Sequence, residues 1–454
     1  MGRDADVIVA GAGAAGLVAA LAAAERGARV ILLDRERNPG GNTALSSAMI
    51  MAAGTRLQRT AGIEEGPEDL YQDIMRRNKG QSDPEVTRAL CEVAPVLVEW
   101  LIDYCGVPLR FVDDFAYPGH SRCRFHAPPD RTGRELVDGL LRRIQEEPGI
   151  LFVTEVTVEQ LIQDERSGIA GVVARAGERE ELRAASVILA TGGFGANRAL
   201  LREYIPDMAT AFYYGSHTNL GDAVRMGRAV GAELAHMGAF QGHGLVTHPY
   251  GLPINWAGVV HGAFLVNLDG RRFVNEDVGP SSVARYVLAQ PQGLACIIMD
   301  EYVVAHLRRF REFRELEGEG ALRGPCRDAV ELAHALRIDA AGLADELGAY
   351  QTAFGSSGGV DRMGRTSGRA LSPPLYGARV QGALYHTQGG LRVNAKAQVL
   401  RPGKVPIPGL FAAGGAAAGI SGDGPDGYLP GNGLLSALGL GFIAGREAAA
   451  RAAV

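Results

Sequence analysis

Three glycines at fixed spacing, Gly11, Gly13 and Gly16, are the first residues in the chain whose types could do chemistry. They lie between an apolar run at 7–10 and an Ala-rich stretch, so we expect a strand, a turn and a helix. In such a unit the first glycine permits the tight turn, the second lets a pyrophosphate approach the backbone, and the third lets helix and strand pack closely. The N-terminus of the helix offers N–H groups and the positive end of its dipole to phosphates. The spacing therefore predicts a dinucleotide site.

Asp34 ends a second expected strand, 29–33, and lies eighteen residues after Gly16. A carboxylate at this distance accepts hydrogen bonds from a ribose and favours free hydroxyl groups over a 2′-phosphate. The same glycine pattern occurs again at 422–427, but no strand or helix is expected around it, and Pro425 blocks a helix. We interpret this second copy as a loop.

Length and composition limit the classes of function, since 454 residues are enough for two or three domains. The net charge of −5 does not indicate binding to nucleic acid or to an anionic membrane. The 5 cysteines lack C-x-x-C spacing, so we expect neither a metal site nor a disulfide framework. The fold begins by residue 6, which leaves no room for a leader, and the glycines in the apolar stretch 7–24 argue against a membrane span. We therefore expect a cytoplasmic protein.

The pattern of apolar and charged residues differs between two parts of the chain. Up to about residue 236, strands alternate with amphipathic helices, whereas strands and heavily charged helices of another style follow. Gly-rich strand–turn motifs return near His386. The pattern predicts an α/β dinucleotide domain split by an insertion. Its expected helices lie in 67–105, 134–147, 301–317, 327–350 and 434–450, its strands at 151–154, 186–190, 259–267 and 295–299, and a hairpin turn at 269–272.

Two polar stretches could line a bound ligand. The loop 39–47 contains small donors and backbone N–H groups that could surround a flavin ring and its ribityl chain. The run 117–126 is dense in polar and cationic side chains within an apolar protein. Its Tyr117, Arg124 and His126 could contact an acidic or ketonic substrate, or the run could be a solvated loop.

Together these motifs resemble the flavoprotein subunits of fumarate reductase and succinate dehydrogenase and their soluble relatives, over nearly the whole chain. The resemblance is carried by the opening glycine unit and by the segments 40–43, 190–195, 386–390 and 409–414. It implies an α/β class fold: a Rossmann-like, glutathione-reductase-like FAD-binding domain with an inserted α+β capping domain. By analogy the FAD-binding domain covers 1–236 and 385–454, and the capping, substrate-binding domain covers 237–384. It also implies hydride transfer between a substrate C–C bond and flavin N5.

The resemblance implies noncovalent FAD, because Asn42 stands where covalent members of the family carry a flavin-linked histidine. Gly415 replaces the acid that usually follows the Ala-Ala-Gly motif. The glycine unit and the resemblance together give the expected FAD-binding residues: Gly11, Gly13, Ala14, Gly16, Asp34, Arg35, Gly41, Asn42, Thr43, Ser47, Val156, Thr191, Gly192, Asn219, Asp222, Gly414, Gly415, Leu434 and Leu435.

Departures from the family pattern bear on the substrate. His243 and His386 match two substrate-binding histidines, but the residues of the proton path fall near Trp256, so that path is absent. The arginine that donates a proton in fumarate reduction falls near Pro280, and the arginine that clamps a carboxylate falls on Tyr428. A dicarboxylate needs cationic, bidentate partners. Fumarate or succinate chemistry is therefore not expected.

The segment 428–433 instead resembles the 3-ketosteroid and related cyclic-ketone dehydrogenases, which use a tyrosine near a Gly-rich turn to polarise a ketone. The Tyr428 hydroxyl and a backbone N–H, that of Gly433 above all, would stabilise a developing enolate. The other reading of Tyr428 is a residue that packs against the flavin. The expected catalytic residues are Tyr428, His386, His243 and Gly433, and the expected substrate-binding residues are Tyr117, Arg124, His126 and Trp256.

These features predict an FAD-dependent oxidoreductase of CH–CH bonds, a dehydrogenase or ene-reductase that desaturates or reduces the α,β bond of a carbonyl compound such as a cyclic ketone or ketosteroid. One alternative is a reductase of an unsaturated carboxylic acid, with Arg122, Arg124 or His386 as the anion partner. Another is a non-catalytic flavin-binding subunit for electron transfer. A flavin monooxygenase would share the opening fold, but the family motifs and the insertion argue against it. Without a second credible nucleotide motif, we expect electrons to be exchanged with a quinone, another flavoprotein or oxygen.

Overall fold

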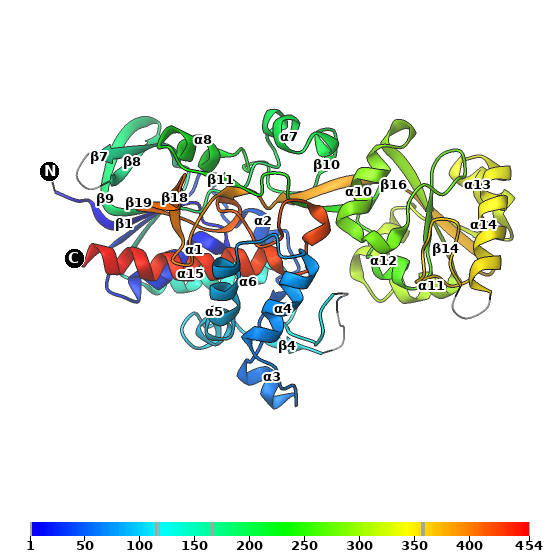
Figure 1. The fold of residues 1–454 in the computed structure, drawn as a ribbon, viewed down its shortest axis with the longest axis horizontal. Coiled ribbons are helices and arrows are strands. Elements are labelled where there is room, and N and C mark those ends of the chain that lie inside the picture. The colour runs from blue at the N-terminus through cyan, green and yellow to red at the C-terminus, as the bar shows by residue number, and fades with distance from the viewer. Residues whose placement is uncertain (1, 114–116, 118, 165–167, 356–358, 454) are drawn as a thin grey trace. The chain divides into compact units, whose positions relative to one another are not determined.

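The computed structural model of the protein describes residues 2–113, 117, 119–164, 168–355 and 359–453. The chain forms two compact units, whose elements are labelled in Figure 1. Unit 1 comprises Met1–Leu200, Gly215–Phe240 and His386–Val454, and unit 2 comprises Leu201–Tyr214 and Gln241–Tyr385. The expected boundaries near 236 and 384 lie close to two of these junctions. The segment 201–214, which we assigned to the FAD-binding domain, groups with unit 2 instead.

A parallel sheet forms the centre of unit 1. Its strands follow the order β18-β19-β9-β1-β2-β6, and the pairs from β19 to β6 are parallel. Because β1 lies between β2 and β9, the strand order reverses at β1, and ligands of open α/β sheets bind beyond the carboxyl end of such a strand. The bounds are β1 Ala5–Ala10, β2 Val30–Leu33, β6 Ile150–Val153, β7 Thr157–Asp164, β8 Gly168–Ala176, β9 Glu178–Leu189, β18 Gln398–Arg401 and β19 Val405–Ala412.

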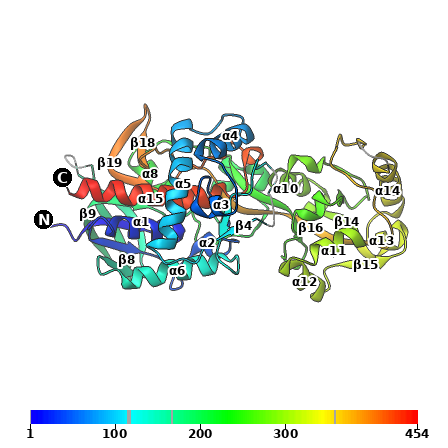
Figure 2. The same ribbon diagram turned by 90° about the horizontal axis from the view of Figure 1, so that it is seen from below.

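Helix α1 (Ala14–Ala24) packs against α15 (Asn432–Ala452), and the two helices lie side by side in Figure 1 and Figure 2. Every residue of α1 is buried. A β-carbon on Gly441 would lie 2.4 Å from the carbonyl oxygen of Ala15, and one on Gly445 would lie 2.3 Å from that of Ala19. This close approach of two backbones requires glycine in α15, and it fixes the last helix of the chain against the helix of the dinucleotide motif.

The remaining helices of unit 1 include those expected in 67–105 and 134–147. Asp83 caps α5 by accepting hydrogen bonds from the backbone N–H groups of Glu85 and Val86. The helices are α2 Gly41–Ala44, α3 Arg56–Thr60, α4 Pro67–Arg77, α5 Pro84–Asp103, α6 Gly133–Glu146 and α8 Asp222–Ala229, and α7 Arg198–Tyr204 crosses between the units. The small sheets are formed by β3 Ile50–Met51, β4 Arg110–Val112 and β5 Phe125–Ala127, and by β11 Leu234–Ala235 and β17 Gly390–Leu391.

Unit 2 has its own hydrophobic core around a second sheet of order β10-β16-β14-β13, in which β14 pairs antiparallel with β13 and β16. The predicted fold class, a Rossmann-like α/β domain with an inserted α+β segment, is confirmed. The strands are β10 Phe212–Tyr213, β12 Phe240–Thr247, β13 Phe264–Val266, β14 Leu294–Asp300, β15 Arg323–Cys326 and β16 Leu375–Thr387. The helices are α9 Ala257–Val260, α10 Pro280–Leu288, α11 Glu301–Leu307, α12 Arg311–Gly318, α13 Ala329–Leu336 and α14 Ala340–Phe354.

The strand expected at 259–267 is wrong in its first half. The Asn255 side chain accepts the Ala257 N–H at 2.9 Å and starts the short helix α9, so the strand begins only at Phe264. The turn at 269–272 forms, but it joins no hairpin, because β13 pairs with β14 instead. Residues Pro425–Gly427 form a single 3-10 turn, which agrees with the loop expected for the second glycine pattern.

Membrane-spanning helices and metal-binding clusters are both absent from the described residues. No helix in that part of the chain is both long and apolar enough to cross a bilayer. No group of three or more histidine, cysteine, aspartate or glutamate side chains among the same residues could hold a metal ion.

Candidate active site

The turn between β1 and α1 has the close contacts that the glycine spacing predicts. Gly11 has φ +104°, and a β-carbon there would lie 2.3 Å from the carbonyl oxygen of Ala190. A β-carbon on Gly16 would lie 1.7 Å from the carbonyl oxygen of Gly11. Beside Gly13 the nearest protein atom to such a β-carbon is 3.7 Å away, so protein packing alone does not require glycine there. The space at Gly13 is what a bound pyrophosphate needs.

Asp34 lies just beyond the carboxyl end of β2 and ties that strand to the glycine turn. Its Oδ2 accepts the Ala12 N–H at 2.6 Å, and its Oδ1 accepts the Glu36 N–H at 2.7 Å. Burial raises the pKa of Asp34, and the two N–H groups oppose the rise. Each carboxylate oxygen can accept a second hydrogen bond, so Asp34 retains the capacity to bind a ribose hydroxyl. Val156 is next to it, because the Val156 N–H donates to the Asp34 carbonyl oxygen at 2.9 Å.

The loop after β2 contacts the glycine turn on one side and residues 216 and 219 on the other. Thr43 Oγ1 accepts the Ala14 N–H at 3.1 Å. Asn42 Oδ1 accepts the Ser216 N–H at 2.6 Å and an amide hydrogen of Asn219 at 2.9 Å. The Asn42 side chain, at the position of the flavin-linked histidine in covalent relatives, is therefore held by hydrogen bonds within unit 1.

Just past the carboxyl end of β9, an unpaired hydroxyl lies beside close backbone contacts. Thr191 Oγ1 is buried and has no hydrogen-bond partner among the residues that the structure describes. A β-carbon on Gly192 would lie 2.0 Å from Asn219 Oδ1, and one on Gly415 would lie 2.6 Å from the Gly193 nitrogen. A buried hydroxyl without a hydrogen-bond partner is unfavourable, and a ligand beyond the carboxyl ends of β1 and β9 would provide a partner for Thr191. The residues present therefore fit a dinucleotide cofactor.

Two of the expected FAD-binding residues pair with each other, because the Arg35 guanidinium donates to the Asp222 carboxylate at the start of α8. The others lie in turns or at a helix start: Gly41 in α2, Gly414 in a 3-10 turn, Leu434 and Leu435 in the first turn of α15, and the exposed Ser47 after α2.

Three of the expected catalytic residues, Tyr428, His386 and Gly433, lie together in unit 1. The His386 ring meets the Tyr428 ring edge-on, with centroids 6.0 Å apart. A β-carbon on Gly433 would lie 3.0 Å from His386 Nε2. Burial lowers the pKa of His386 to about 4 and raises the pKa of Tyr428. Both side chains are therefore uncharged at neutral pH and can donate hydrogen bonds to an uncharged ligand.

The turn after Tyr428 differs in one detail from the expected arrangement. The backbone N–H of Gly431 faces the Tyr428 hydroxyl and offsets part of the rise in the pKa of Tyr428. Gly433, expected to share a substrate oxygen with Tyr428, lies against the His386 ring. Tyr117, an expected substrate contact, lies near enough to Tyr428 to raise its pKa further.

Two residues far earlier in the chain hold this turn, and sequence reasoning missed their role. Arg77, the last residue of α4, donates from Nε to the Tyr428 carbonyl oxygen at 3.2 Å. His120 Nε2 lies 2.9 Å from the Pro430 carbonyl oxygen, and burial lowers the pKa of His120 to about 4, so the neutral ring donates this bond. No motif marks either residue as a support for this turn, and only the fold brings them together.

Arg124 and His126, both expected to bind the substrate, are fully buried. Arg124 donates to Asp73 Oδ2 at 2.7 Å and to Glu65 Oε2 at 2.8 Å. His126 Nε2 lies 2.9 Å from Thr55 Oγ1, and burial lowers the pKa of His126 to about 4. These contacts engage both side chains in the interior of unit 1.

In unit 2, His243 belongs to a row of aromatic side chains. It stacks on Tyr385 with centroids 5.6 Å apart and planes 10° apart, and it meets Trp256 edge-on at 6.1 Å. Tyr214 extends the row at 5.1 Å from Tyr385. The Leu245 N–H donates to His243 Nδ1 at 3.1 Å, and burial lowers the pKa of His243 to about 4. His243 is therefore neutral and carries its proton on Nε2.

Tyr385 and Tyr214 were not among the expected site residues, although Tyr385 directly precedes the motif 386–390. Burial raises the pKa of both tyrosines, and the Glu312 carboxylate adds to the rise in each. Both tyrosines are therefore protonated at neutral pH, and a flat, uncharged ligand could pack against the rings.

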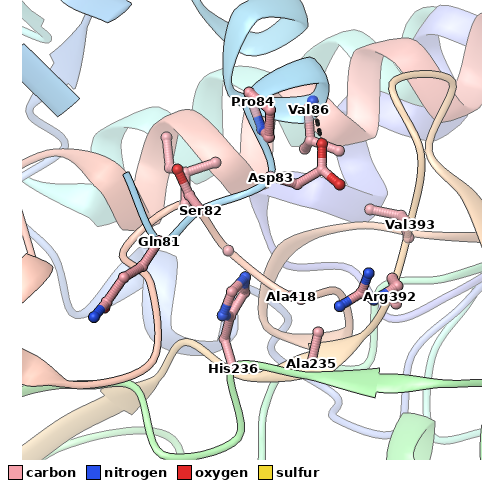
Figure 3. Close-up of a pocket in the computed structure, with 12 residues that line it drawn as sticks. Gln81, Ser82, Asp83, Pro84, Val86, Ala235, His236, Arg392, Val393 and Ala418 are labelled. Carbon is pink, nitrogen blue, oxygen red and sulfur yellow. Dashed lines mark hydrogen bonds between the residues drawn. The ribbon is translucent and has the colours of Figure 1, made fainter. Parts of the chain in front are cut away.

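Unit 1 also contains a pocket of ≈ 240 Å³, drawn in Figure 3. It lies between the N-terminus of α5 and the segments around β11 and β17, with Ser82, Asp83, His236 and Arg392 among its polar lining residues. No expected site residue lines it. His236 Nδ1 lies 2.6 Å from Asp423 Oδ1, so its ring is already engaged by a carboxylate.

Comparison with known proteins agrees with this geometry. The sequence matches the family of FAD binding domains over residues 6–434. It is 33% identical over 457 residues to the NADH:fumarate oxidoreductase of Klebsiella pneumoniae, covering 98% of this chain and 48% of that protein. It is 32% identical over 454 residues to a probable fumarate reductase of Shewanella frigidimarina, covering 98% of this chain and 75% of that protein. The chain thus spans about half the length of the first relative and three quarters of the second.

One solved structure similar to this chain is that of a 3-ketosteroid dehydrogenase. The 3-ketosteroid-Δ4-(5α)-dehydrogenase from Rhodococcus jostii RHA1 superposes with a TM-score of 0.80 at 27% sequence identity, covering 99% of this chain and 98% of that one. Both branches of the resemblance expected from the sequence are confirmed.

Proposed function

Because the chain belongs to the family of FAD binding domains and its cofactor is FAD, we propose that it is a dehydrogenase or ene-reductase acting on CH–CH bonds. Its substrate is an uncharged carbonyl compound, most simply a cyclic ketone, whose α,β bond is desaturated or reduced. Bound FAD supplies the two-electron redox chemistry at that bond. The chain's own residues bind the substrate, orient it and stabilise the charge that develops on it.

Tyr428 donates its hydroxyl proton to the carbonyl oxygen of the substrate. Negative charge grows on this oxygen when the α-carbon loses its proton, or when a hydride reaches the β-carbon, and a fixed donor stabilises that charge. Burial raises the pKa of Tyr428, which keeps the phenol protonated at neutral pH. Neutral His386, edge-on to Tyr428, acts as a second donor.

One observation carries this proposal: Tyr428, His386 and Gly433 lie together in unit 1, and none of these residues is a cation that could pair with a carboxylate. Burial lowers the pKa of His386 and His243 to about 4 and raises the pKa of Tyr428. Arg124, the buried cation expected near the site, is engaged by Asp73 and Glu65. Taking the two carboxylates of fumarate out of water without a cationic partner costs several kcal/mol or more. A ketone carries no such cost.

The second candidate is the reduction of an unsaturated carboxylic acid. It is favoured by the relatives of Klebsiella and Shewanella, whose names refer to fumarate. The anion partners considered for it give little support, because Arg122 is exposed, Arg124 is ion-paired and His386 is neutral.

The two candidates separate in an anaerobic experiment on the FAD-loaded protein. Oxidised protein is mixed with saturated cyclic ketones and 3-ketosteroids, and chemically reduced protein with cyclic enones, fumarate and other unsaturated acids. Loss or return of the oxidised flavin absorbance measures each reaction. We expect ketones or enones to react and fumarate to react far more slowly than about 1 s⁻¹. Rapid oxidation by fumarate with no response to any ketone would overturn the proposal.

The proposals for the electron partner and the location rest on the sequence alone. We propose that a quinone, another flavoprotein or oxygen exchanges electrons with the protein, and that it works in the cytoplasm. Stopped-flow reoxidation of the reduced protein by each acceptor, and fractionation of the cells that make it, test these two points.

A further inference from the structure

A chain of buried polar side chains connects His386 to the start of α15. Gln388 Nε2 lies 3.3 Å from His386 Nδ1. Ser421 Oγ donates to Gln388 Oε1 at 3.1 Å, and Asn432 Nδ2 donates to Ser421 Oγ at 3.1 Å. We call Gln388, Ser421 and Asn432 the Gln388 relay. It lies wholly within unit 1.

The relay is buried, and the Gln388 amide has little freedom to move. Gln388, Ser421 and Asn432 are 4%, 1% and 0% exposed. Buried amides and hydroxyls destabilise a protein unless they are hydrogen-bonded, so these groups depend on one another. A β-carbon on Gly419 would lie 2.6 Å from Gln388 Oε1, and the Gly419 N–H donates to the Gln388 carbonyl oxygen at 2.8 Å. The backbone thus holds the amide close on one side.

The direction of each bond in the relay determines where His386 carries its proton. His386 Nδ1 has two neighbours, Gln388 Nε2 at 3.3 Å and the Thr387 carbonyl oxygen at 3.4 Å. An amide nitrogen can only donate, so the shorter contact with Gln388 has Nδ1 as the acceptor, whereas a bond to Thr387 would need the proton on Nδ1. A neutral imidazole that accepts at Nδ1 has its proton on Nε2. Burial keeps the ring neutral at pH 7 by lowering the pKa of His386 to about 4. The other titratable ring in contact with His386 is Tyr428, which is also uncharged.

We propose that Gln388 is a positioning residue: its amide fixes His386 as the neutral Nε2–H tautomer, so that this N–H is presented to the substrate as a donor. The role of that donor rests on the proposed function, whereas the tautomer itself does not. His243 in unit 2 is held as the same tautomer by a different donor, the Leu245 N–H. Two histidines singled out by the sequence therefore share one protonation pattern, imposed by a side-chain amide in one case and by the backbone in the other.

The tautomer can be read directly, without a substrate. Two-bond proton–nitrogen NMR spectra of the FAD-loaded protein, labelled with ¹⁵N-histidine, distinguish Nε2–H, Nδ1–H and doubly protonated rings. The His386 signals are assigned by their loss in His386→Asn. We expect the Nε2–H pattern for His386 in the unsubstituted protein, without protonation between about pH 8 and pH 5.5. An Nδ1–H pattern in this spectrum would overturn the proposal before any other variant is made.

Gln388→Glu tests the cause, because it keeps the shape of the side chain and replaces the donor by an acceptor. The carboxylate would pair with an N–H on Nδ1, so His386 should become doubly protonated near neutral pH. Turnover should fall at least tenfold, and the pH profile of kcat should gain a step that follows the titration seen by NMR. Gln388→Met removes the donor without adding charge, and it should give a mixture of the two neutral tautomers. A pure Nε2–H pattern in Gln388→Met would overturn the proposal.

Gln160→Glu is the matched control, since it makes the same chemical change at an exposed position of β7. It should leave the spectrum and the turnover unchanged. The two proposals can fail separately. If the tautomers respond as expected but no ketone or enone reacts, the proposed function is wrong, whereas the control of the His386 tautomer by Gln388 is confirmed.

Discussion

A β-carbon on Gly433 would lie 2.9 Å from His386 Cε1, so the first turn of α15 and the His386 ring fit only because residue 433 is glycine. Gly433→Ala should displace the His386 ring, so that His386 Nδ1 loses its contact with Gln388. Overpacking of this kind lowers the free energy of unfolding by about 1–3 kcal/mol. We expect FAD to stay bound and kcat to fall at least tenfold. Gly348→Ala is the control, because a β-carbon at this exposed helical position meets no atom within 4 Å. Equal turnover in the two variants would show that His386 does not need its present position.

Removal of the Tyr428 hydroxyl is expected to lower kcat strongly. Tyr428→Phe removes the donor while keeping the ring that contacts His386 edge-on. Removing one oxyanion donor typically lowers kcat about 10²–10³-fold. Flavin content and thermal unfolding should change little, and Tyr286→Phe, at an exposed position, should change neither turnover nor stability. Unchanged turnover in Tyr428→Phe would show that Tyr428 serves only in packing. The reduction of an unsaturated carboxylic acid would then be the better candidate function.

Arg124 is expected to stabilise the fold and not to bind the substrate. Its guanidinium is fully buried between Asp73 and Glu65, and removing one partner of a buried ion pair costs about 3–5 kcal/mol. Arg124→Gln should therefore unfold at lower denaturant concentration, while its folded fraction keeps the KM of the original protein. Arg122→Gln, at the exposed neighbouring position, should change neither quantity. A raised KM in Arg124→Gln at full occupancy with FAD would restore Arg124 as a substrate contact.

Buried neutral histidines should make the protein less stable in mild acid. Burial lowers the pKa of His126 from 6.5 to about 4, so between these values the unfolded chain binds a proton that the folded chain does not. The stabilisation is complete above about pH 6.5 and is lost as pH falls toward 4, by about 2 kcal/mol between pH 7.5 and pH 5 for this residue alone. Urea unfolding at the two pH values measures the loss. His126→Asn should reduce it, whereas His217→Asn, whose side chain is 87% exposed, should not.

FAD is expected to be released whole when the protein is denatured. Asn42 has an amide where covalent relatives have a nucleophilic ring, and its oxygen is already engaged by Ser216 and Asn219. Acid precipitation should leave all the yellow colour in the supernatant. Flavin that remains with the pellet would show a covalent link at another residue.

Local sequence patterns were enough to predict the parts of the fold that depend on short-range rules. The glycine unit, Asp34 after its strand and the helices in 67–105 are determined by spacing, apolar periodicity and caps, and the structure has them in those places. The start of β13 was missed because the Asn255 side chain accepts the Ala257 N–H and turns the chain into α9, which periodicity does not register. The supports of the candidate site were missed for a different reason. Arg77 reaches the Tyr428 carbonyl across 351 positions, and no local pattern records a contact made only by the completed fold.

The contribution of the last two elements to unit 1 has a consequence for how the protein is made. Strand β19 pairs with β9, and α15 packs along α1, so residues made long after β1, α1 and β9 complete the sheet and cover the helix that begins the cofactor motif. At about 5–20 residues per second, on the order of 10–50 s separate the synthesis of residue 200 from that of residue 452. During that interval one edge of β9 is unpaired and α1 lacks its main partner. We therefore expect a stable FAD site to form only after α15 has been made.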